Sequence, residues 1–298
     1  MASRSRLLLL GRTGQVGFEL ERALGPLGAV TAVDRAGADL AQPGQLRELV
    51  RNVRPAVIVN AAAYTAVERT EREEALAARI NGEAPGVLAE EAQRLHALIV
   101  HYSTDYVFDG TKAGAYLESD ACAPLNAYGR TKLAGERAIQ ATGAAHLIFR
   151  TSWVYGARGS NFYLTMRRLF LEQPELKVVA DQVGAPTWCR AVAEATALAL
   201  SQLLAPKASF TGRDVSGIYH LTAGGETSWY GFATAILALH PPAPGTAPPR
   251  LIPIPAEHYP SPARRPANSR MDCSKLGDTF GISLPDWNTA LAQVAQAV

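Results

Sequence analysis

The stretch Leu7-Leu8-Leu9-Leu10-Gly11-Arg12-Thr13-Gly14-Gln15-Val16-Gly17 decides the fold class of this chain. Four consecutive leucines are typical of a buried strand, and three glycines in the spacing GxxGxxG are typical of a tight turn into a helix. Without side chains at the turn, backbone N–H groups and a helix N-terminus can approach a pyrophosphate. Many helices begin at a glycine turn, so the prediction depends on the strand before it. We expect a dinucleotide cofactor at Gly11, Gly14, Gln15 and Val16.

Further apolar runs alternate with amphipathic stretches downstream of this turn. Such alternation is typical of parallel strands joined by right-handed helical crossovers. It predicts an α/β fold, a Rossmann-type doubly wound parallel sheet. The further predicted strands are Val30–Val33, Val57–Asn60, Leu98–His101 and Leu147–Phe149, and the clearest helices are Gln45–Val53 and Ala84–Leu95.

The regular alternation weakens after about residue 150. Prolines crowd residues 240–249, which predicts an exposed loop, and the following Arg250–Pro255 resembles an edge strand. We expect a dinucleotide-binding domain over residues 1–150, to which segments near residues 176–220 return. Residues 151–298 would mainly form a smaller, discontinuous C-terminal substrate domain.

Composition excludes several classes of partner. The chain has 298 residues, 48% hydrophobic content and a formal net charge of only +2, with no long basic run, so we expect no nucleic acid. No apolar stretch of ~18 residues occurs, which predicts a cytoplasmic protein with no membrane partner. Cys122, Cys189 and Cys273 form no CxxC pair, so we expect neither disulfides nor a structural metal.

Two opposite charges end the second predicted strand and leave the choice of cofactor open. Asp34 stands where a carboxylate can accept hydrogen bonds from an adenosine ribose, which favours NADH, whereas Arg35 could pair with the 2′-phosphate of NADPH. Asp39 and Leu40 could bracket the adenine. The cofactor is therefore predicted to be NADPH or NADH.

Three alanines follow the third predicted strand, in Asn60-Ala-Ala-Ala-Tyr64-Thr65. Their small side chains allow close packing at the carboxyl edge of the sheet, where ligands bind in such folds. Ala63, Tyr64 and Thr65 are therefore candidate cofactor contacts.

Tyr128 and Lys132 are four residues apart on a predicted helix, so a phenol and an ammonium share one face. We expect hydride to pass from a nicotinamide to a ketone carbon while Tyr128 donates its proton to the developing alkoxide. Lys132 and the positive charge of an oxidised nicotinamide would lower the pKa of Tyr128, and Lys132 could also hold the nicotinamide ribose. Thr104, after the fourth strand, would hydrogen-bond the ketone oxygen or the phenol. Asn81 could support a proton relay or cap a helix, and the sequence leaves this open.

Over nearly its whole length the chain resembles the extended short-chain dehydrogenase/reductases. The resemblance depends on seven motifs: Gly11–Gly17, Val59–Val67, His101–Gly110, Pro124–Glu136, Phe149–Gly156, Asp181–Thr187 and Pro262–Arg270. The last two are similar to a branch that reduces keto-sugar nucleotides rather than to epimerases or dehydratases.

The resemblance implies a dTDP-linked 4-keto-6-deoxy sugar as substrate, specifically dTDP-4-dehydro-6-deoxy-L-mannose reduced at C4. Tyr128 would be the acid, assisted by Lys132 and Thr104. Trp153 could pack over the sugar ring, and arginines in the last motif offer planar donors for a diphosphate. The implied substrate contacts are Tyr102, Thr104, Asp105, Tyr128, Trp153, Arg264 and Arg270, with Arg265 as a further candidate donor.

The chain departs from the family pattern at two places. Tyr64 stands where many members have histidine. Some members form a dimer in which glutamates bridge through magnesium; Glu19 fits the first of these positions, but Arg190 stands at the second and the last turn, residues 293–298, contains no acid. We therefore expect no metal, and a monomer or a weak metal-free homodimer.

Two other functions stay open from sequence. One is the reduction of another dTDP-4-keto-6-deoxyhexose, because sequence does not determine the face of hydride attack. The other is a non-catalytic regulatory subunit that retains cofactor binding, against which the presence of Thr104, Tyr128 and Lys132 weighs.

Overall fold

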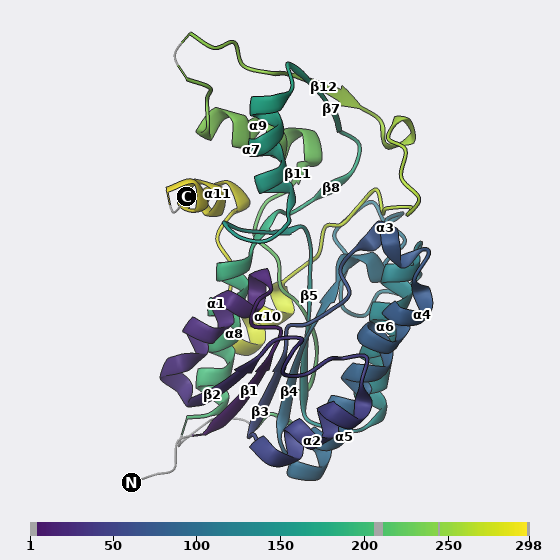
Figure 1. The fold of residues 1–298 in the computed structure, drawn as a ribbon, viewed down its shortest axis with the longest axis vertical. Helices are drawn as coiled ribbons and strands as arrows, with labels where there is room; N and C mark the ends of the chain where they lie inside the picture. The colour runs from purple at the N-terminus through teal and green to yellow at the C-terminus, as the bar shows by residue number, and fades with distance from the viewer. Residues whose placement is uncertain (1–4, 206–210, 244, 297–298) are drawn as a thin grey trace.

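A six-stranded parallel sheet forms the centre of the structure, a computed structural model that describes residues 5–205, 211–243 and 245–296 (Figure 1). The strand order is β10-β5-β4-β3-β1-β2, so the chain leaves β1 in one direction and later continues in the other. This is the doubly wound arrangement that was predicted, and it is confirmed. The strands are β1 (Arg6–Leu10), β2 (Ala29–Val33), β3 (Val57–Asn60), β4 (Leu98–Thr104), β5 (His146–Thr151) and β10 (Gly217–His220).

Alternate residues of β1 face opposite layers of helices. Leu7 and Leu9 pack in one core, and Leu8 and Leu10 pack in another. Figure 1 shows two groups of helices that cover the sheet, one group on each face. The first group is α1 (Gln15–Leu24), α8 (Cys189–Leu203) and α10 (Ser274–Phe280), and the second is α2 (Pro43–Val53), α5 (Ala84–Leu95) and α6 (Ala127–Ala141).

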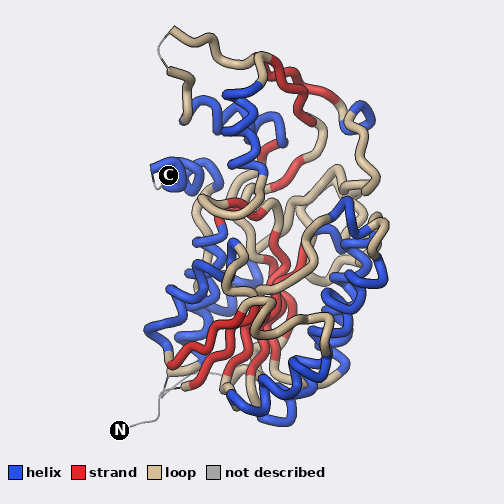
Figure 2. The backbone as a smooth tube through the Cα atoms, viewed as in Figure 1, coloured by secondary structure: helices blue, strands red, loops and turns tan. Residues whose placement is uncertain are grey.

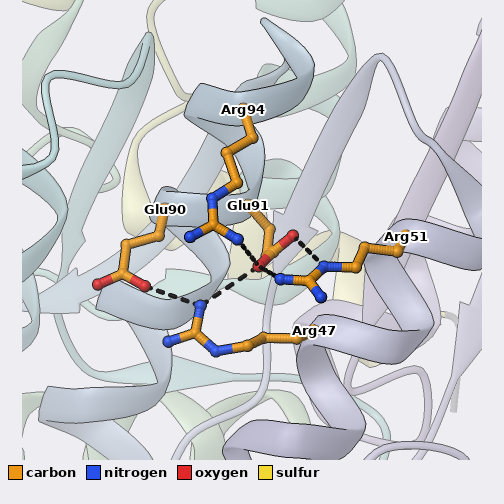
Figure 3. Close-up of polar contacts among 5 residues, drawn as sticks. All are labelled: Arg47, Arg51, Glu90, Glu91 and Arg94. Carbon is orange, nitrogen blue, oxygen red and sulfur yellow. Dashed lines mark hydrogen bonds and ion pairs between the residues drawn. The ribbon is translucent and has the colours of Figure 1, made fainter.

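A buried carboxylate ties α2 to α5 (Figure 3). The Glu91 side chain is 2% exposed and accepts hydrogen bonds from Arg47, Arg51 and Arg94. Hydrogen bonding to Arg51 is the largest of the effects that hold the Glu91 pKa below its ordinary value. These arginines already have carboxylate partners, Glu90 included, so the cluster fastens two helices and does not form a free anion site.

A second core lies beyond the carboxyl edge of the sheet, in the upper part of Figures 1 and 2. Residues predicted as an edge strand form β12, which pairs with β7 alone among the described strands, as expected. Residues 241–243 and 245–249, on the described sides of the proline-rich segment, contain no helix or strand; residue 244 lies outside the described part, as do residues 297–298 of the last turn. The elements here are α7 (Phe162–Glu172), α9 (Trp229–Leu239), α11 (Trp287–Gln296), β6 (Val154–Tyr155), β7 (Glu175–Val179), β8 (Val183–Gly184), β9 (Thr187–Trp188), β11 (Thr227–Ser228) and β12 (Arg250–Ile254).

Within the described residues, no helix combines the length and the apolar character that crossing a lipid bilayer requires.

Candidate active site

A cavity of about 710 Å³ opens at the carboxyl edge of the sheet. Its walls come from the turn after β1, the ends of β2 to β5, α6 and the second core. Every residue predicted for the site lines it except Arg264 and Arg270. Those that line it are Gly11, Gly14, Gln15, Val16, Asp34, Asp39, Leu40, Ala63, Tyr64, Thr65, Tyr102, Thr104, Asp105, Tyr128, Lys132 and Trp153.

The glycine turn has a shape that side chains would block. Gly11 has a φ of +87°, and a Cβ atom there would lie 2.8 Å from the backbone nitrogen of Ala62. A Cβ atom at Gly17 would overlap the carbonyl oxygen of Gly11. Gly14 is the N-cap residue of α1 and supplies no side-chain cap. The first N–H groups of this ten-residue helix have no side-chain cap and belong to residues that line the cavity. They can therefore bind an anion such as a pyrophosphate.

Opposite charges lie at the end of β2, as predicted. Asp34 Oδ1 accepts hydrogen bonds from the N–H groups of Ala36 (3.0 Å) and Gly37 (3.2 Å) and so shapes its own turn. The Arg35 side chain is 80% exposed and only 3.6 Å from Asp39. Because exposed charges at this distance interact weakly, Arg35 can turn toward a 2′-phosphate at little cost.

Asn81 fixes the loop after β3. It is buried in a π-helix, Ala78–Glu83, where its Oδ1 accepts from the Tyr64 N–H (2.8 Å) and its Nδ2 donates to the Tyr64 carbonyl (3.0 Å). The same Nδ2 lies 3.3 Å from Thr131 Oγ1 on α6. Of the two roles left open for Asn81, its position inside a helix does not fit an N-cap; its contacts make it a clamp between the loop and α6.

Tyr128 stands in the first turn of α6. Asn126 caps this helix by accepting a hydrogen bond from the Gly129 N–H (2.8 Å), and the Tyr106 ring meets the Tyr128 ring edge-on at 5.7 Å. Burial, followed by the charge of Asp105 and then Tyr106, raises the Tyr128 pKa above its ordinary value, and a hydrogen bond with Thr104 opposes the rise. The lowering expected from Lys132 together with an oxidised nicotinamide concerns the cofactor complex, so it stays a prediction; within the protein, desolvation of the phenol dominates and raises the pKa of Tyr128.

Lys132 is buried one helical turn from Tyr128 and points at β4. Its Nζ donates to the Tyr102 carbonyl (2.6 Å) and lies 3.1 Å from His101 Nε2. Burial lowers the Lys132 pKa to about 8, with the nearby Glu136 opposing. Sequence reasoning did not single out His101, although a histidine directly after the apolar run Leu98–Val100 was a usable signal.

Thr104 and Asp105 form a buried polar pair at the end of β4. Thr104 Oγ1 donates to Asp105 Oδ1 at 2.9 Å and accepts from the Tyr106 N–H at 3.1 Å. The second carboxyl oxygen of Asp105 accepts from the Ser269 hydroxyl. Burial raises the Asp105 pKa to about 6, while the hydrogen bonds with Ser269 and Thr104 oppose the rise.

Two aromatic residues predicted to contact substrate are engaged with the protein. The Tyr102 hydroxyl is 2.8 Å from Thr196 Oγ1, in the core beneath the cavity. Trp153 has a φ of +48° and stacks on Trp229 at 3.6 Å, with Gly184 close to its indole. The ring of Trp153 is therefore covered by Trp229, a residue of α9 that also lines the cavity and that sequence reasoning missed.

The three arginines predicted for the diphosphate differ in whether they reach the cavity. Arg264 is exposed, and Arg270 pairs with Glu226 at 3.0 Å, so the structure brings neither to the cavity. Arg265 does line it, 3.1 Å from Glu68, and its buried Nε has no hydrogen-bond partner among the described residues. Arg265 is half-buried and faces the cavity, whereas the adjacent Arg264 is exposed.

The two helices on one face of the sheet are joined by Glu19 and Arg190. Arg190 Nε donates to Glu19 Oε2 at 3.0 Å, and its guanidinium lies 4.9 Å from the Trp188 ring centroid. In the part of the chain that the structure describes, no three His, Cys, Asp or Glu residues gather in a way that could hold a metal ion.

Comparison with known proteins gives a consistent result. The family described as "RmlD substrate binding domain" matches residues 5–298. The chain is 52% identical to a dTDP-4-dehydrorhamnose reductase of Burkholderia thailandensis, over 96% of each sequence. Among solved structures it is similar to a dTDP-4-dehydrorhamnose reductase of Clostridium acetobutylicum (TM-score 0.89, 34% identity, covering 98% of this chain and 99% of that one). It is also similar to one of Bacillus anthracis in complex with NADP (TM-score 0.88, 31% identity, covering 99% and 100%).

Proposed function

The chain belongs to the family of dTDP-4-dehydrorhamnose reductases, and from this premise we propose that it reduces the C4 ketone of dTDP-4-dehydro-6-deoxy-L-mannose to dTDP-L-rhamnose. The observation that carries the proposal is the meeting of Tyr128, Lys132 and Thr104 in one cavity with the glycine turn. Because NADPH or NADH is the reductant, we infer a cytoplasmic reaction.

The cofactor end of the cavity fits a dinucleotide. The turn at Gly11 and Gly14 and the start of α1 would hold the pyrophosphate, and Asp34 with Arg35 would meet the adenosine ribose. Asp39, Leu40, Ala63 and Thr65 complete the wall. The bound nicotinamide supplies the hydride.

At the reacting end, Tyr128 donates its proton to the oxygen that gains negative charge as C4 is reduced. Lys132, held on the Tyr102 carbonyl one helical turn from Tyr128, stabilises the phenolate that Tyr128 becomes through its positive charge. The raised pKa of Tyr128 keeps the phenol protonated at neutral pH, as a proton donor requires.

The substrate end would be built mainly by residues beyond 151 and by the loop after β4. Asp105 can contact the sugar, and Trp153 offers the edge of its indole because Trp229 covers its face. We assign the diphosphate to Arg265 in place of Arg264 and Arg270, because its guanidinium lines the cavity. Residues 1–150 would thus hold the cofactor and most residues of 151–298 the sugar nucleotide.

The direct test supplies the purified protein with enzymatically generated dTDP-4-dehydro-6-deoxy-L-mannose and either reductant. We expect loss of reduced nicotinamide with dTDP-L-rhamnose identified by NMR. A product epimeric at C4 would identify a related 4-keto-6-deoxyhexose reductase, and cofactor binding without turnover on any keto-sugar nucleotide would identify a regulatory subunit.

A further inference from the structure

Asn60, His101 and Lys132 form a buried chain of polar contacts that runs from β3 through β4 to α6. All three residues are 2% exposed or less. Asn60 Nδ2 lies 3.2 Å from His101 Nδ1, and His101 Nε2 lies 3.1 Å from Lys132 Nζ. The imidazole ring thus stands between an amide group and the lysine that assists the proposed reduction.

The Asn60 amide decides which nitrogen of His101 carries the hydrogen. Asn60 Oδ1 accepts a hydrogen bond from the Ala62 N–H at 3.3 Å, so the amino group of Asn60 faces His101. An amino group only donates, which makes His101 Nδ1 the acceptor. Burial, followed by the charge of Lys132, holds the His101 pKa well below its ordinary value, so the ring is neutral and has a single N–H. That hydrogen is therefore on Nε2 and points at Lys132.

The hydrogen on His101 Nε2 conflicts with a charged Lys132. An ammonium has three N–H donors and no acceptor, so it would face a second donor at 3.1 Å. A neutral amine has a lone pair, which can accept from His101 while the amine still donates to the Tyr102 carbonyl at 2.6 Å. The hydrogen bonds of this chain thus favour the neutral amine of Lys132.

Burial acts on Lys132 in the same direction. It lowers the Lys132 pKa to about 8, and the charge of Glu136 opposes this effect. Glu136 is ion-paired with Arg150 of β5 at 2.6 Å, so its negative charge is largely compensated. Lys132 therefore changes its charge within a pH range in which the protein can be studied.

The other titratable groups at this end of the cavity keep one charge state around pH 8. Burial raises the pKa of Tyr128 on α6 and lowers that of His101 on β4, so both are neutral there. Asp105, at the end of β4, has a pKa of about 6 and is ionised. The residues of β3 are uncharged. A pH effect centred near 8 therefore reports Lys132.

We propose that Asn60 and His101 are positioning residues that favour the neutral amine of Lys132 in the free protein, so that binding of NADPH or NADH draws a proton from water onto Lys132. The proposal rests on the proposed reduction. Hydrogen bonds from an ammonium to ribose oxygens are roughly twice as strong as those from an amine, so Lys132 is protonated when it holds the nicotinamide ribose. The only bond formed in this step is the new N–H bond, at the cavity that Lys132 lines.

The direction of the pH effect follows from this linkage. The protonated form of Lys132 holds the reduced cofactor more tightly. The affinity should therefore be complete below the Lys132 pKa of about 8 and should fall as pH rises through it. The positive charge that stabilises the Tyr128 phenolate is thus supplied when the cofactor arrives.

The first test determines the tautomer of His101 by nitrogen-15 NMR of the histidine-labelled wild-type protein, which needs neither cofactor nor turnover. We expect hydrogen on Nε2 of His101. His146 is an internal reference of the opposite kind, because its Nδ1 lies 2.8 Å from the Ala144 carbonyl and must donate to it. Hydrogen on Nδ1 of His101, or an imidazolium ring, would overturn the proposal.

The second test measures proton uptake on NADPH binding, by calorimetry in buffers of different ionisation enthalpy. We expect uptake of about half a proton or more at pH ~8, and an NADPH affinity that falls between about pH 7 and pH 9.5. The 2′-phosphate of NADPH titrates near pH ~6, below this range. Binding without proton uptake in the wild-type protein would contradict the linkage.

Two variants give Lys132 an acceptor in place of the His101 hydrogen. His101→Gln offers an amide oxygen to the ammonium and adds no charge. Asn60→Asp offers a carboxylate, which only accepts, so the hydrogen of His101 should move to Nδ1 and Nε2 should accept from Lys132. In both variants we expect the fall in affinity to move to higher pH by about one pH unit or more, and the uptake at pH ~8 to be largely lost.

His146→Gln is the matched control and should leave both quantities as in the wild type. Unchanged uptake in His101→Gln would mean that burial alone sets the charge of Lys132, and it would overturn the role of His101. An unchanged tautomer in Asn60→Asp would overturn the role of Asn60. If a variant does not fold, the tautomer and the proton uptake of the wild type still decide the proposal.

Failure of this inference differs from failure of the proposed function. The proposed function fails if the protein does not turn over the sugar nucleotide with either reductant. The inference concerns the free protein and the binding of NADPH, so it fails through the tautomer of His101 or through the proton count even where reduction is observed.

Discussion

At the scale of single residues, Tyr128 has the most specific task, and its phenolic hydrogen can be removed without changing the ring. Tyr128→Phe keeps the edge-on contact with Tyr106 and the packing of α6. We expect turnover to fall by ~100-fold or more while cofactor affinity is retained, because only proton donation is lost. Steady-state kinetics and titration with NADPH measure the two quantities. Unchanged turnover would contradict the assignment of Tyr128 as the acid.

Thr104 can be tested with an isosteric pair of variants. Thr104→Val removes the hydroxyl that donates to Asp105 and that opposes the rise of the Tyr128 pKa, whereas Thr104→Ser keeps it. We expect Val to lower kcat by ~10-fold or more with little change in KM, and Ser to retain most of the rate. A rise in KM alone would place Thr104 in substrate binding.

Residue types in sequence motifs located these groups but did not reveal their partners. Tyr128 and Lys132 could be paired from their spacing, because helical periodicity is local. The raised pKa of Tyr128 could not be predicted, since it arises from burial and from Asp105, whose charge depends on the fold. Ser269 and Trp229 were missed because their contacts come from segments distant in the chain.

At the scale of elements, α6 and the π-helix before α5 are packed almost backbone to backbone. A Cβ atom at Gly135 would overlap the carbonyl oxygen of Asn81, the residue that clamps Tyr64. We expect Gly135→Ala to lower the free energy of unfolding by about 1–3 kcal/mol, measured by urea denaturation, and to weaken cofactor binding. Gly44→Ala is the matched control, since a Cβ there in α2 meets open space. Equal stability of the two variants would contradict this account.

The elements themselves differ in how well sequence predicts them. Val57–Asn60 and Ala84–Leu95 have the predicted bounds, because continuous apolar runs and amphipathic periodicity are strong signals. β4 extends to Thr104, three residues beyond the prediction, because its polar end is buried by tertiary contacts. The π-helix at Ala78–Glu83 could not be predicted, because six residues are too few to reveal a change of period.

At the scale of the whole molecule, the buried carboxyl of Asp105 should make stability depend on pH. Its pKa is raised from 3.8 to about 6, so the folded state binds a proton more tightly than the unfolded state. The resulting stabilisation is complete below pH ~3.8 and is lost as pH rises through about 6, at a cost of about 3 kcal/mol. The unfolding free energy of wild type minus that of Asp105→Asn should fall by this order between acid and neutral pH. A constant difference would mean that Asp105 titrates normally.

Assembly is the other property of the whole molecule that one ion pair can decide. Arg190 forms an ion pair with Glu19 at 3.0 Å. A cation that bridges two subunits would need an acidic residue in place of Arg190. We expect light scattering to give the same molar mass in magnesium and in chelator, that of a monomer or a weak homodimer. Arg190→Glu places two carboxylates together, so it should lower stability in chelator, and magnesium should recover part of the loss. A wild-type dimer that dissociates when magnesium is removed would show that the ion pair does not replace the metal.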